Sequence, residues 1–337
     1  MFKLLPCLYI NITERCNMQC EYCPAFGENW ESTEGLMPLT DLLTVIDVAV
    51  DLGLESFRIS GGEPMIFPEP VFAVLDVLRR RDQKDIILNT NGFNTYKYID
   101  HLRDYPIRKV KISLDSVDKK RFKQITNRDK LEDVIQSIRA VKDAGVGIEL
   151  NLVLLRSFVD DFWGVLDFCV RECISLKVLD LVKYDTFVRN ALSPDEYWER
   201  EYYSPGLLVE DLSKRFGKPR VVRLSNERGI PMTEFDLGNG AKLTLKDGGK
   251  GSTFGKVCQS CHQFPCQEGL FHLSLSAEGN LTPCRLRRDL VHSLVGLPRE
   301  DIRRLVERAL EAYGDVSFME KTIVFPMSLA KEHVHDN

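Results

Sequence analysis

Six short apolar runs alternate with longer helical patterns in the first part of the chain, and this alternation constrains the fold most. The runs resemble strands and lie at 8–12, 55–60, 85–90, 107–114, 147–154 and 176–182. Apolar residues at helical spacing occupy 40–52, 130–144 and 159–173. Repeated βα units favour a parallel sheet, because each crossover returns the chain to the same end of the sheet. We therefore predict an α/β fold, a partial (βα)6 TIM-like barrel over 1–185, with its chemistry at the carboxyl ends of the strands.

The remaining part, 186–337, does not continue the alternation of strand-like runs and helical patterns. A linker leads to a helix near 206–216, a small β-rich piece, a strand-like run at 270–276 and an amphipathic helix at 299–313. We expect an α+β extension that forms a second domain. In the first part, Thr40 is a candidate helix N-cap and Gly53 a candidate helix stop.

Charge and hydropathy exclude several classes of protein. The 337 residues carry a net charge of −5, which argues against a general nucleic-acid coat. No stretch approaches the roughly 18 apolar residues that span a bilayer, and the N-terminal apolar run is too short for a secretory signal. We expect a cytoplasmic protein without a membrane or nucleic-acid partner, in which clustered cysteines are more often metal ligands than disulfides.

Ten cysteines are present, and the first group follows the first predicted strand. Cys16, Cys20 and Cys23 form a C-x3-C-x2-C pattern. Three thiolates in one loop can hold three irons of a cubane cluster and leave the fourth iron open, whereas ferredoxins use four cysteines. A zinc site completed from elsewhere and three unrelated thiols are the alternatives.

A second group lies near the C-terminus. It consists of Cys258, Cys261, Cys266 and Cys284, a set that would also suit zinc. Nearby His262 and His272 are weaker candidate ligands. The other cysteines are predicted to pack in the core: Cys7, and Cys169 and Cys173, which lie four residues apart on an apolar helix face.

Short motifs follow the predicted strands in a fixed order and carry a resemblance to a known family. After the first strand, Tyr22 precedes the last cysteine of the first group; later strands end in Ser60-Gly61-Gly62-Glu63-Pro64, Asn89-Thr90-Asn91-Gly92 and Ser113-Leu114-Asp115-Ser116. Together these motifs resemble the radical S-adenosylmethionine (SAM) superfamily.

The resemblance implies a reaction and a set of SAM contacts. A reduced [4Fe-4S] cluster on Cys16, Cys20 and Cys23 would donate one electron to SAM, and the resulting 5′-deoxyadenosyl radical would abstract a hydrogen atom from substrate. The implied SAM-binding residues are Tyr22, Gly61, Gly62, Glu63, Pro64, Thr90, Asn91, Ser113, Asp115, Arg128 and Asn151. Within that set, Glu63 would accept from the SAM ammonium, and Arg128 would pair with its carboxylate. The glycines would allow close approach of the backbone to the cofactor.

The C-terminal pattern resembles the MoaA-like branch, which includes the GTP 3′,8-cyclases, and the wider group with SPASM or Twitch domains. Gly279-x4-Cys284 recurs in that group, and the stretch 111–151 is especially similar to MoaA. The resemblance implies a second, auxiliary [4Fe-4S] cluster. Either all four C-terminal cysteines ligate it, or Cys266 is spare and the other three do.

Departures from the cyclases concern the cations that a triphosphate requires. At four positions where the cyclases carry basic residues, this chain has Leu8-Tyr9-Ile10, Met65-Ile66-Phe67-Pro68, Glu149-Leu150-Asn151 and His262-Gln263-Phe264-Pro265-Cys266. The Gly-Gly tail of the cyclases is absent as well, because the chain ends in Val334-His335-Asp336-Asn337. We therefore predict a substrate other than GTP.

The predicted function is a radical SAM enzyme that acts on a small biosynthetic molecule of nucleotide, nucleoside or sugar type, with flavodoxin or ferredoxin as electron donor. The first cysteine group lies too near the N-terminus for a preceding leader-binding domain, which favours a small molecule over a peptide. Arg285, Arg287 and Arg288 are candidate anion contacts or a solvated basic run. The alternatives are a SPASM-type peptide maturase, a GTP 3′,8-cyclase, and a non-catalytic iron–sulfur or zinc scaffold.

Overall fold

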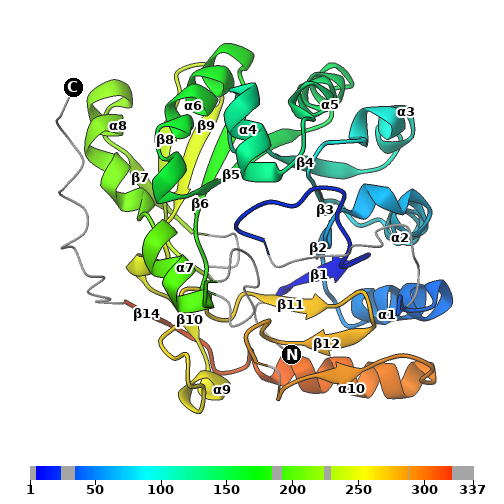
Figure 1. Cartoon of the computed structure of the whole chain (residues 1–337). Coiled ribbons are helices and arrows are strands. Elements are labelled where there is room, and N and C mark those ends of the chain that lie inside the picture. The colour runs from blue at the N-terminus through cyan, green and yellow to red at the C-terminus, as the bar shows by residue number, and fades with distance from the viewer. Residues whose placement is uncertain (1–4, 24–34, 184–191, 224–228, 288, 321–337) are drawn as a thin grey trace.

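The structure is a computed structural model that describes residues 5–23, 35–183, 192–223, 229–287 and 289–320 (Figure 1). Its strands are β1 Cys7–Asn11, β2 Ser56–Ser60, β3 Asp85–Thr90, β4 Ile107–Ser113, β5 Ile148–Leu154, β6 Ser175–Asp180, β7 Arg220–Val222, β8 Met232–Asp236, β9 Lys242–Lys246, β10 Ser252–Phe254, β11 His272–Leu275, β12 Asn280–Thr282, β13 His292–Ser293 and β14 Ser317–Met319. Its α-helices are α1 Leu39–Asp51, α2 Pro68–Arg80, α3 Ile99–Leu102, α4 Lys119–Thr126, α5 Leu131–Asp143, α6 Asp161–Glu172, α7 Pro194–Glu201, α8 Val209–Phe216, α9 Lys256–Gln259 and α10 Arg299–Glu311. The 3-10 turns are η1 Pro64–Ile66, η2 Thr95–Tyr98, η3 Arg156–Phe158, η4 Pro205–Leu208 and η5 Gly248–Lys250.

One long curved sheet organises the described part of the chain. Its twelve strands run in the order β13-β12-β11-β1-β2-β3-β4-β5-β6-β9-β8-β7. The inner eight, from β11 to β9, are parallel, while β12, β13, β8 and β7 are antiparallel additions at the two ends. No ladder joins the two end strands within this sheet order, so the sheet is an open barrel. The predicted α/β class with a partial TIM-like barrel is confirmed.

Helices cover the outer face of this sheet, as Figure 1 shows. They do so because their apolar residues repeat on one face: α5 buries Leu131, Val134, Ile138 and Val141. The six predicted strands correspond to β1 to β6, and the predicted helices to α1, α5 and α6, with bounds that differ by at most two residues. The parallel barrel strands therefore bring their carboxyl ends to one rim.

Two local predictions are wrong. Helix α1 begins at Leu39 after Pro38, so Thr40 lies inside the first turn and is not the N-cap. Cys173 is exposed, because α6 ends at Glu172 and Cys173 takes a left-handed φ of 54° at the C-cap, where the i, i+4 spacing no longer applies. Gly53, with φ of 88°, does follow the end of α1, and Cys7 and Cys169 are buried as predicted.

The C-terminal region contributes to the same sheet. The predicted helices near 206–216 and 299–313 are α8 and α10, and the run 270–276 contains β11. Strand β9 pairs with β6, and β11 pairs with β1, so this region supplies two of the parallel strands. The proposed domain boundary at 185 lies outside the described residues, and the division stays a prediction.

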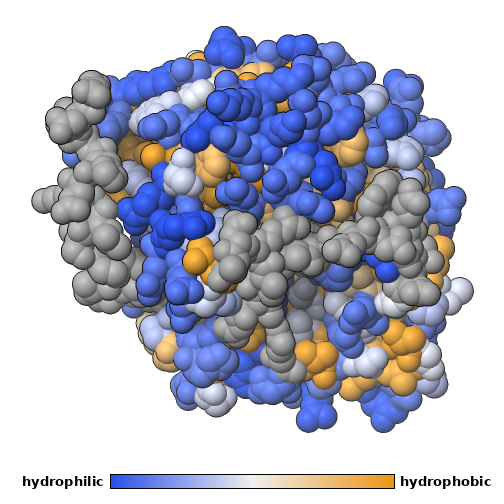
Figure 2. Space-filling view, in the orientation of Figure 1, coloured by the Kyte–Doolittle hydropathy of each residue, from blue (hydrophilic) through white to orange (hydrophobic). Residues whose placement is uncertain are grey.

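The face of the molecule in Figure 2 is largely hydrophilic, with apolar side chains in small separate groups. The large apolar side chains of the sheet and helices are mostly buried, among them Phe57, Phe122 and Phe162. Among the described residues, no helix has the length and apolar character that crossing a membrane requires.

Candidate active site

The loop after β1 carries Cys16, Cys20 and Cys23, and several contacts fix it at the rim of the barrel. Its backbone bonds to the end of α4, with Gln19 N–H donating to Thr126 O and Glu21 N–H donating to Ile125 O, both at 2.9 Å. The Arg128 guanidinium donates to Asn17 O at 3.0 Å and to Asn127 O at 3.1 Å. These contacts hold the loop; pairing of Arg128 with a cofactor carboxylate stays a prediction.

Gly61 and Gly62 lie directly against this loop. A Cβ at Gly61 would lie 2.3 Å from Thr13 O, and one at Gly62 would lie 2.1 Å from Arg15 O. The Gly62 N–H donates to Thr13 O at 2.6 Å, and the Glu63 N–H donates to Arg15 O at 2.7 Å. In addition, Gly61 has a φ of 140°, which side chains rarely adopt. Glycine is therefore required at both positions because the backbone of the cysteine loop lies too close for a side chain.

Glu63 connects the ends of β2 and β3. Its side chain is buried, and its carboxylate accepts from Met65 N–H at 2.9 Å, from the Thr90 hydroxyl at 2.7 Å and from Asn91 N–H at 2.5 Å. Burial raises the pKa of Glu63 to about 7, against the three hydrogen bonds that lower it. Next to Glu63, Pro64 begins η1. Acceptance from a cofactor ammonium by Glu63 stays a prediction.

Asn91 supports the first cysteine of the loop. Its Nδ2 donates to Asn17 Oδ1 at 2.7 Å and lies 3.5 Å from Cys16 Sγ, which also accepts from Met18 N–H at 3.4 Å. Burial raises the pKa of the Cys16 thiol to about 12. A metal that binds Cys16 must therefore displace the thiol proton.

On the other side of the loop, Tyr22 meets the ends of β4 and β5. Its hydroxyl donates to Asp115 Oδ2 at 2.7 Å, and Asp115 Oδ1 accepts from Val153 N–H at 3.0 Å. Burial raises the pKa of Asp115 to about 6. In the β4–β5 ladder, Ser113 lies opposite Asn151, and Asn151 Oδ1 is buried without a hydrogen-bond partner among the described residues. An orphaned buried acceptor on β5 is an atom that a bound cofactor could satisfy.

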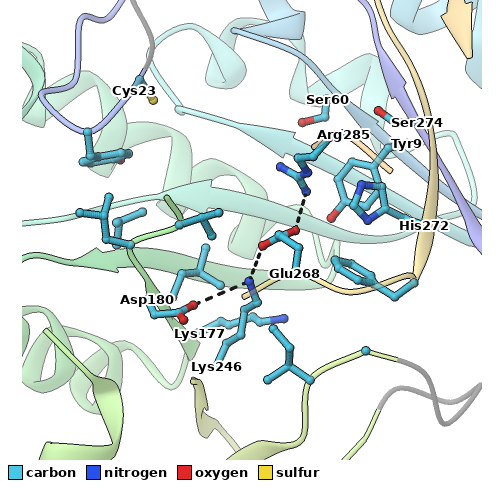
Figure 3. A pocket seen from close by; sticks show the side chains of 18 of the residues that line it. Tyr9, Cys23, Ser60, Lys177, Asp180, Lys246, Glu268, His272, Ser274 and Arg285 are labelled. Carbon is cyan, nitrogen blue, oxygen red and sulfur yellow. Dashed lines mark hydrogen bonds and ion pairs between the residues drawn. The ribbon is translucent and has the colours of Figure 1, made fainter. Parts of the chain in front are cut away.

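A cavity of about 510 Å³ opens next to the cysteine loop (Figure 3). Tyr22, Cys23 and Gly61 line one end. The opposite walls come from β1, β6, β8, β9 and β11 and from the segments before β11 and after β12. Their lining residues include Tyr9, Lys177, Asp180, Met232, Lys246, Glu268, Phe271, His272, Ser274 and Arg285. The structure thus brings predicted cofactor residues and a set of interior charges to one space.

Three ion pairs cross this cavity between the last strands of the sheet. Lys246 Nζ lies 2.9 Å from Glu268 and 3.7 Å from Asp180, and Arg285 lies 3.5 Å from Glu268. Burial alone would raise the pKa of Glu268, but Lys246 and Arg285 lower it to about 2. The pairs connect β6 and β9 with the segments before β11 and after β12, on the side where the strand ladder of the barrel is interrupted.

The second cysteine group lines a separate, smaller cavity. Cys258, Cys261, Cys266 and Cys284 all face it, together with the apolar side chains of Val257, Phe264, Leu270 and Leu286. Cys266 Sγ accepts from Gly269 N–H at 3.3 Å. Burial raises the pKa of Cys284 to about 11.

Neither cysteine group has its thiols arranged around a single point. Within the described ranges, no group of three or more His, Cys, Asp or Glu side chains that could hold a metal ion is present. The ligands of one zinc ion converge to within about 2.3 Å of a single point. An iron–sulfur cluster instead carries its thiolates on separate irons, so thiols around a cavity can serve it without meeting at one point.

The histidines and arginines predicted as further ligands or anion contacts do not lie together. His262 is exposed, and His272 lines the central cavity rather than the cavity of the second cysteine group. Arg285 also lines the central cavity, Arg287 pairs with Asp289 at 2.6 Å, and Arg288 lies outside the described residues.

Sequence reasoning missed Lys177, Asp180, Lys246 and Glu268. A signal for Lys177 was available, because a lysine in the middle of a parallel strand contradicts its usual continuous apolar character.

The family pattern and the relatives that match this chain belong to the same superfamily. The Radical SAM superfamily pattern matches residues 10–169. A GTP 3′,8-cyclase of Mycolicibacterium smegmatis is 35% identical over 300 residues, which cover 86% of this chain and 77% of that protein. This chain belongs to the radical SAM superfamily. Within the superfamily it is of the MoaA-like group, and a GTP 3′,8-cyclase of Campylobacter curvus is a further relative, 26% identical over 89% of this chain and 86% of its own.

A solved structure agrees in fold. The structure described as native anSMEcpe with bound AdoMet covers 90% of this chain and 82% of its own, with a TM-score of 0.59 and 13% sequence identity. At this identity the likeness concerns the fold alone.

Membership in the superfamily makes the chain an enzyme that uses SAM and at least one [4Fe-4S] cluster. Radical SAM enzymes act on small molecules or peptides and require a reductant. The residues present fit these groups: a loop with three thiols, an amide beside Cys16, and the orphaned Asn151 Oδ1. When bound, the cluster and SAM supply one-electron radical chemistry, and the protein positions and shields it.

Proposed function

We propose that this protein is a radical SAM enzyme that abstracts hydrogen from a small biosynthetic substrate of nucleotide, nucleoside or sugar type. Cys16, Cys20 and Cys23 hold the first cluster in this proposal. The SAM contacts are those implied by the motifs, from Tyr22 at one end of the cavity to Asn151. The observation that carries the proposal is the cavity of about 510 Å³, which begins at Tyr22, Cys23 and Gly61. Its volume lies within the range of small-molecule sites, roughly 300 to 1,000 Å³.

The charge of the cavity supports a substrate other than a triphosphate. Its described lining contains three acidic side chains, Glu14, Asp180 and Glu268, and three basic ones, Lys177, Lys246 and Arg285. A triphosphate requires several cations that are not already paired with carboxylates. Because most of these cations are already paired with carboxylates, the cavity favours a substrate with at most a small net negative charge.

We assign an auxiliary [4Fe-4S] cluster to Cys258, Cys261, Cys266 and Cys284. Support comes from their convergence on one cavity with apolar neighbours and from the N–H of Gly269 at Cys266. Hydrogen bonds to cluster sulfurs are one of the features by which proteins set the potential of such a cluster. Four protein ligands would leave that cluster no open iron, which favours electron transfer or a structural role. We place the protein in the cytoplasm, where thiols stay reduced.

The test is anaerobic reconstitution, reduction with dithionite or flavodoxin, and measurement of 5′-deoxyadenosine from SAM. We expect formation of 5′-deoxyadenosine in the intact enzyme and its loss in Cys20→Ala, because two thiolates cannot hold the first cluster in place of three. The exposed Cys173→Ala is the matched control and should retain activity. Absence of 5′-deoxyadenosine with every substrate class offered would contradict the proposal and favour a scaffold role.

A GTP 3′,8-cyclase is the second candidate, because curated relatives at 35% and 26% identity carry that name. Incubation of the reduced enzyme with SAM and GTP separates the two candidates. Consumption of GTP with stoichiometric 5′-deoxyadenosine would support the cyclase. If peptides alone stimulated SAM cleavage, a peptide maturase would replace both.

A further inference from the structure

In the central cavity, two basic side chains form ion pairs with two carboxylates, and a third basic side chain has no such partner among the described residues. Lys246 is shared by Asp180 and Glu268, and Arg285 lies against Glu268 (Figure 3). Burial alone would lower the pKa of Lys246, but Glu268 and Asp180 hold it above its usual value. These four side chains therefore compensate one another and have no net charge to offer a ligand.

Lys177 is the additional cation. It lies in the middle of β6, opposite Asn151 of β5 and Thr244 of β9, and its ammonium lines the cavity. Within the described part of the chain, and as Figure 3 shows for the cavity, Lys177 makes no hydrogen bond or ion pair. A half-buried ammonium with no acceptor is costly unless a bound group supplies one.

The charged groups around Lys177 do not neutralise it. On β4 and β5, Lys109 and Lys111 each lie 2.6 Å from Glu149, so two cations share one carboxylate there. Lys246 on β9 is the other nearby cation. Burial, reinforced by repulsion from these lysines, lowers the pKa of Lys177 to about 7. An anion placed at Lys177 would relieve this repulsion.

The wall formed by β11 and β1 carries a neutral polar side chain, His272, in contrast to the cation on β6. His272 is 4% exposed, and its Nδ1 has no hydrogen-bond partner among the described residues. Burial and the nearby Arg285 lower the pKa of His272 to about 3, so the imidazole is neutral. Its ring lies 4.7 Å from the Tyr9 ring and its carbonyl accepts from the Tyr313 hydroxyl, which fixes its position.

We propose that this cavity binds a substrate with a single anionic group, a carboxylate or a phosphate monoester, seated on Lys177, and an uncharged polar group against His272. This inference rests on the proposed small-molecule function and narrows its substrate class to acidic sugars and sugar monophosphates. One uncompensated cation matches one anionic group. A fixed neutral imidazole offers a single hydrogen bond to an uncharged hydroxyl or amide and gives no attraction to a second anion.

The test uses the reconstituted, SAM-loaded enzyme and requires no turnover. Trace acetylation with acetic anhydride, followed by peptide mass spectrometry, reports the reactivity of Lys177. The probes are ribose 5-phosphate, D-ribonate and neutral ribose, with inorganic phosphate as the minimal anion. We expect ribose 5-phosphate or D-ribonate to protect Lys177 about tenfold, the effect of one charge-assisted hydrogen bond. Exposed Lys84 is the internal control and should react equally in all samples.

Variants separate the two contacts. Lys177→Gln should weaken ribose 5-phosphate binding about tenfold in equilibrium dialysis. His272→Phe, which keeps a ring against Tyr9, should weaken ribose 5-phosphate or D-ribonate but leave inorganic phosphate unchanged, and His272→Asn should restore part of the loss. Because Lys177 loses its charge above its pKa of about 7, protection should decrease as the pH rises through that value.

The outcomes are distinct from those of the proposed function. If SAM is cleaved while neither anion protects Lys177, or if Lys177 does not react even without a probe, the inference fails and the function stands. If Lys177 is protected while SAM is never cleaved, the function fails and the binding site stands. If GTP protected Lys177 from acetylation at a lower concentration than ribose 5-phosphate or D-ribonate does, the assignment of a substrate with a single anionic group would be overturned. Whichever of ribose 5-phosphate and D-ribonate protects better identifies the anionic group.

Discussion

At the scale of single residues, the Glu63 side chain of the Gly-Gly-Glu-Pro motif accepts hydrogen bonds from other residues of the protein. Three donors from Met65, Thr90 and Asn91 converge on its buried carboxylate. Two strand ends and the amide that reaches Cys16 are thereby fixed to one another. The same geometry limits how many further donors a cofactor could offer to this carboxylate.

The raised pKa of Glu63 predicts a pH effect on stability. A carboxyl whose pKa rises from 4.5 to about 7 on folding stabilises the fold fully below pH 4.5 and loses that contribution as the pH rises through about 7. Glu63→Gln removes this titration. We expect the wild-type thermal midpoint to fall between pH 5 and 7.5 by more than that of the variant, with a difference of about 2 kcal/mol in unfolding free energy over this range. Parallel curves for the two proteins would show that Glu63 does not titrate in this window.

Cys266 gives a second prediction at this scale. Cys266→Ala removes one of the four thiols of the auxiliary cavity and leaves the loop of the first cluster unaltered. We expect a changed electron paramagnetic resonance spectrum and lower iron content for the auxiliary cluster, with the SAM-binding cluster intact. An unchanged auxiliary spectrum would mean that Cys258, Cys261 and Cys284 are the complete ligand set.

At the scale of elements, the end of β2 and the loop after β1 form one unit. Backbone hydrogen bonds from Gly62 and Glu63 to residues 13 and 15 extend the pairing of β1 and β2 into the loop. The absence of side chains at Gly61 and Gly62 permits this approach. The position of the cysteines therefore depends on the neighbouring strand end.

Gly61→Ala tests this unit. The new Cβ would lie 2.3 Å from Thr13 O on a backbone with φ of 140°, so the loop must shift. We expect a cost of about 1–3 kcal/mol in unfolding free energy and reduced iron at the first cluster. Gly164→Ala, a helical position where the Cβ meets only a Val117 methyl at 3.2 Å, is the control and should retain iron. Normal iron content in Gly61→Ala would disprove the dependence on close approach.

At the scale of the whole molecule, buried ion pairs connect the strands on either side of the interrupted barrel ladder. Lys246 on β9 contacts Glu268, which precedes β11, and Asp180 at the end of β6. The Asp180 carboxylate also accepts from Gly248 N–H at 2.8 Å. Charges therefore connect β6 and β9 with the segment before β11, between which the described sheet has no strand ladder.

Lys246→Met tests this closure. It leaves two buried carboxylates without their shared cation, and breaking a buried pair costs about 3–5 kcal/mol. We expect a marked loss of stability in guanidinium unfolding. Lys84→Met removes the exposed partner of Asp82 and should change stability by less than about 1 kcal/mol. Equal effects of the two substitutions would show that the interior pairs contribute little.

The sequence by itself determined what is local. Strand-like runs and apolar helix faces predicted β1 to β6, α5 and α6, because side-chain periodicity reports which face of an element is buried. Motif residues after each strand predicted which side chains gather at one rim, since parallel strands share their carboxyl ends.

Only the tertiary structure decided what depends on contacts between distant segments. It placed β11 beside β1 and β9 beside β6 in one sheet, and it assigned Gly61 and Gly62 to the cysteine loop. It also showed that Lys246 and Arg285 are paired whereas Lys177 makes no ion pair within the described residues. Pairing partners and local solvation are set by non-local packing, so the charge of the substrate cavity could not be obtained from the order of residues alone.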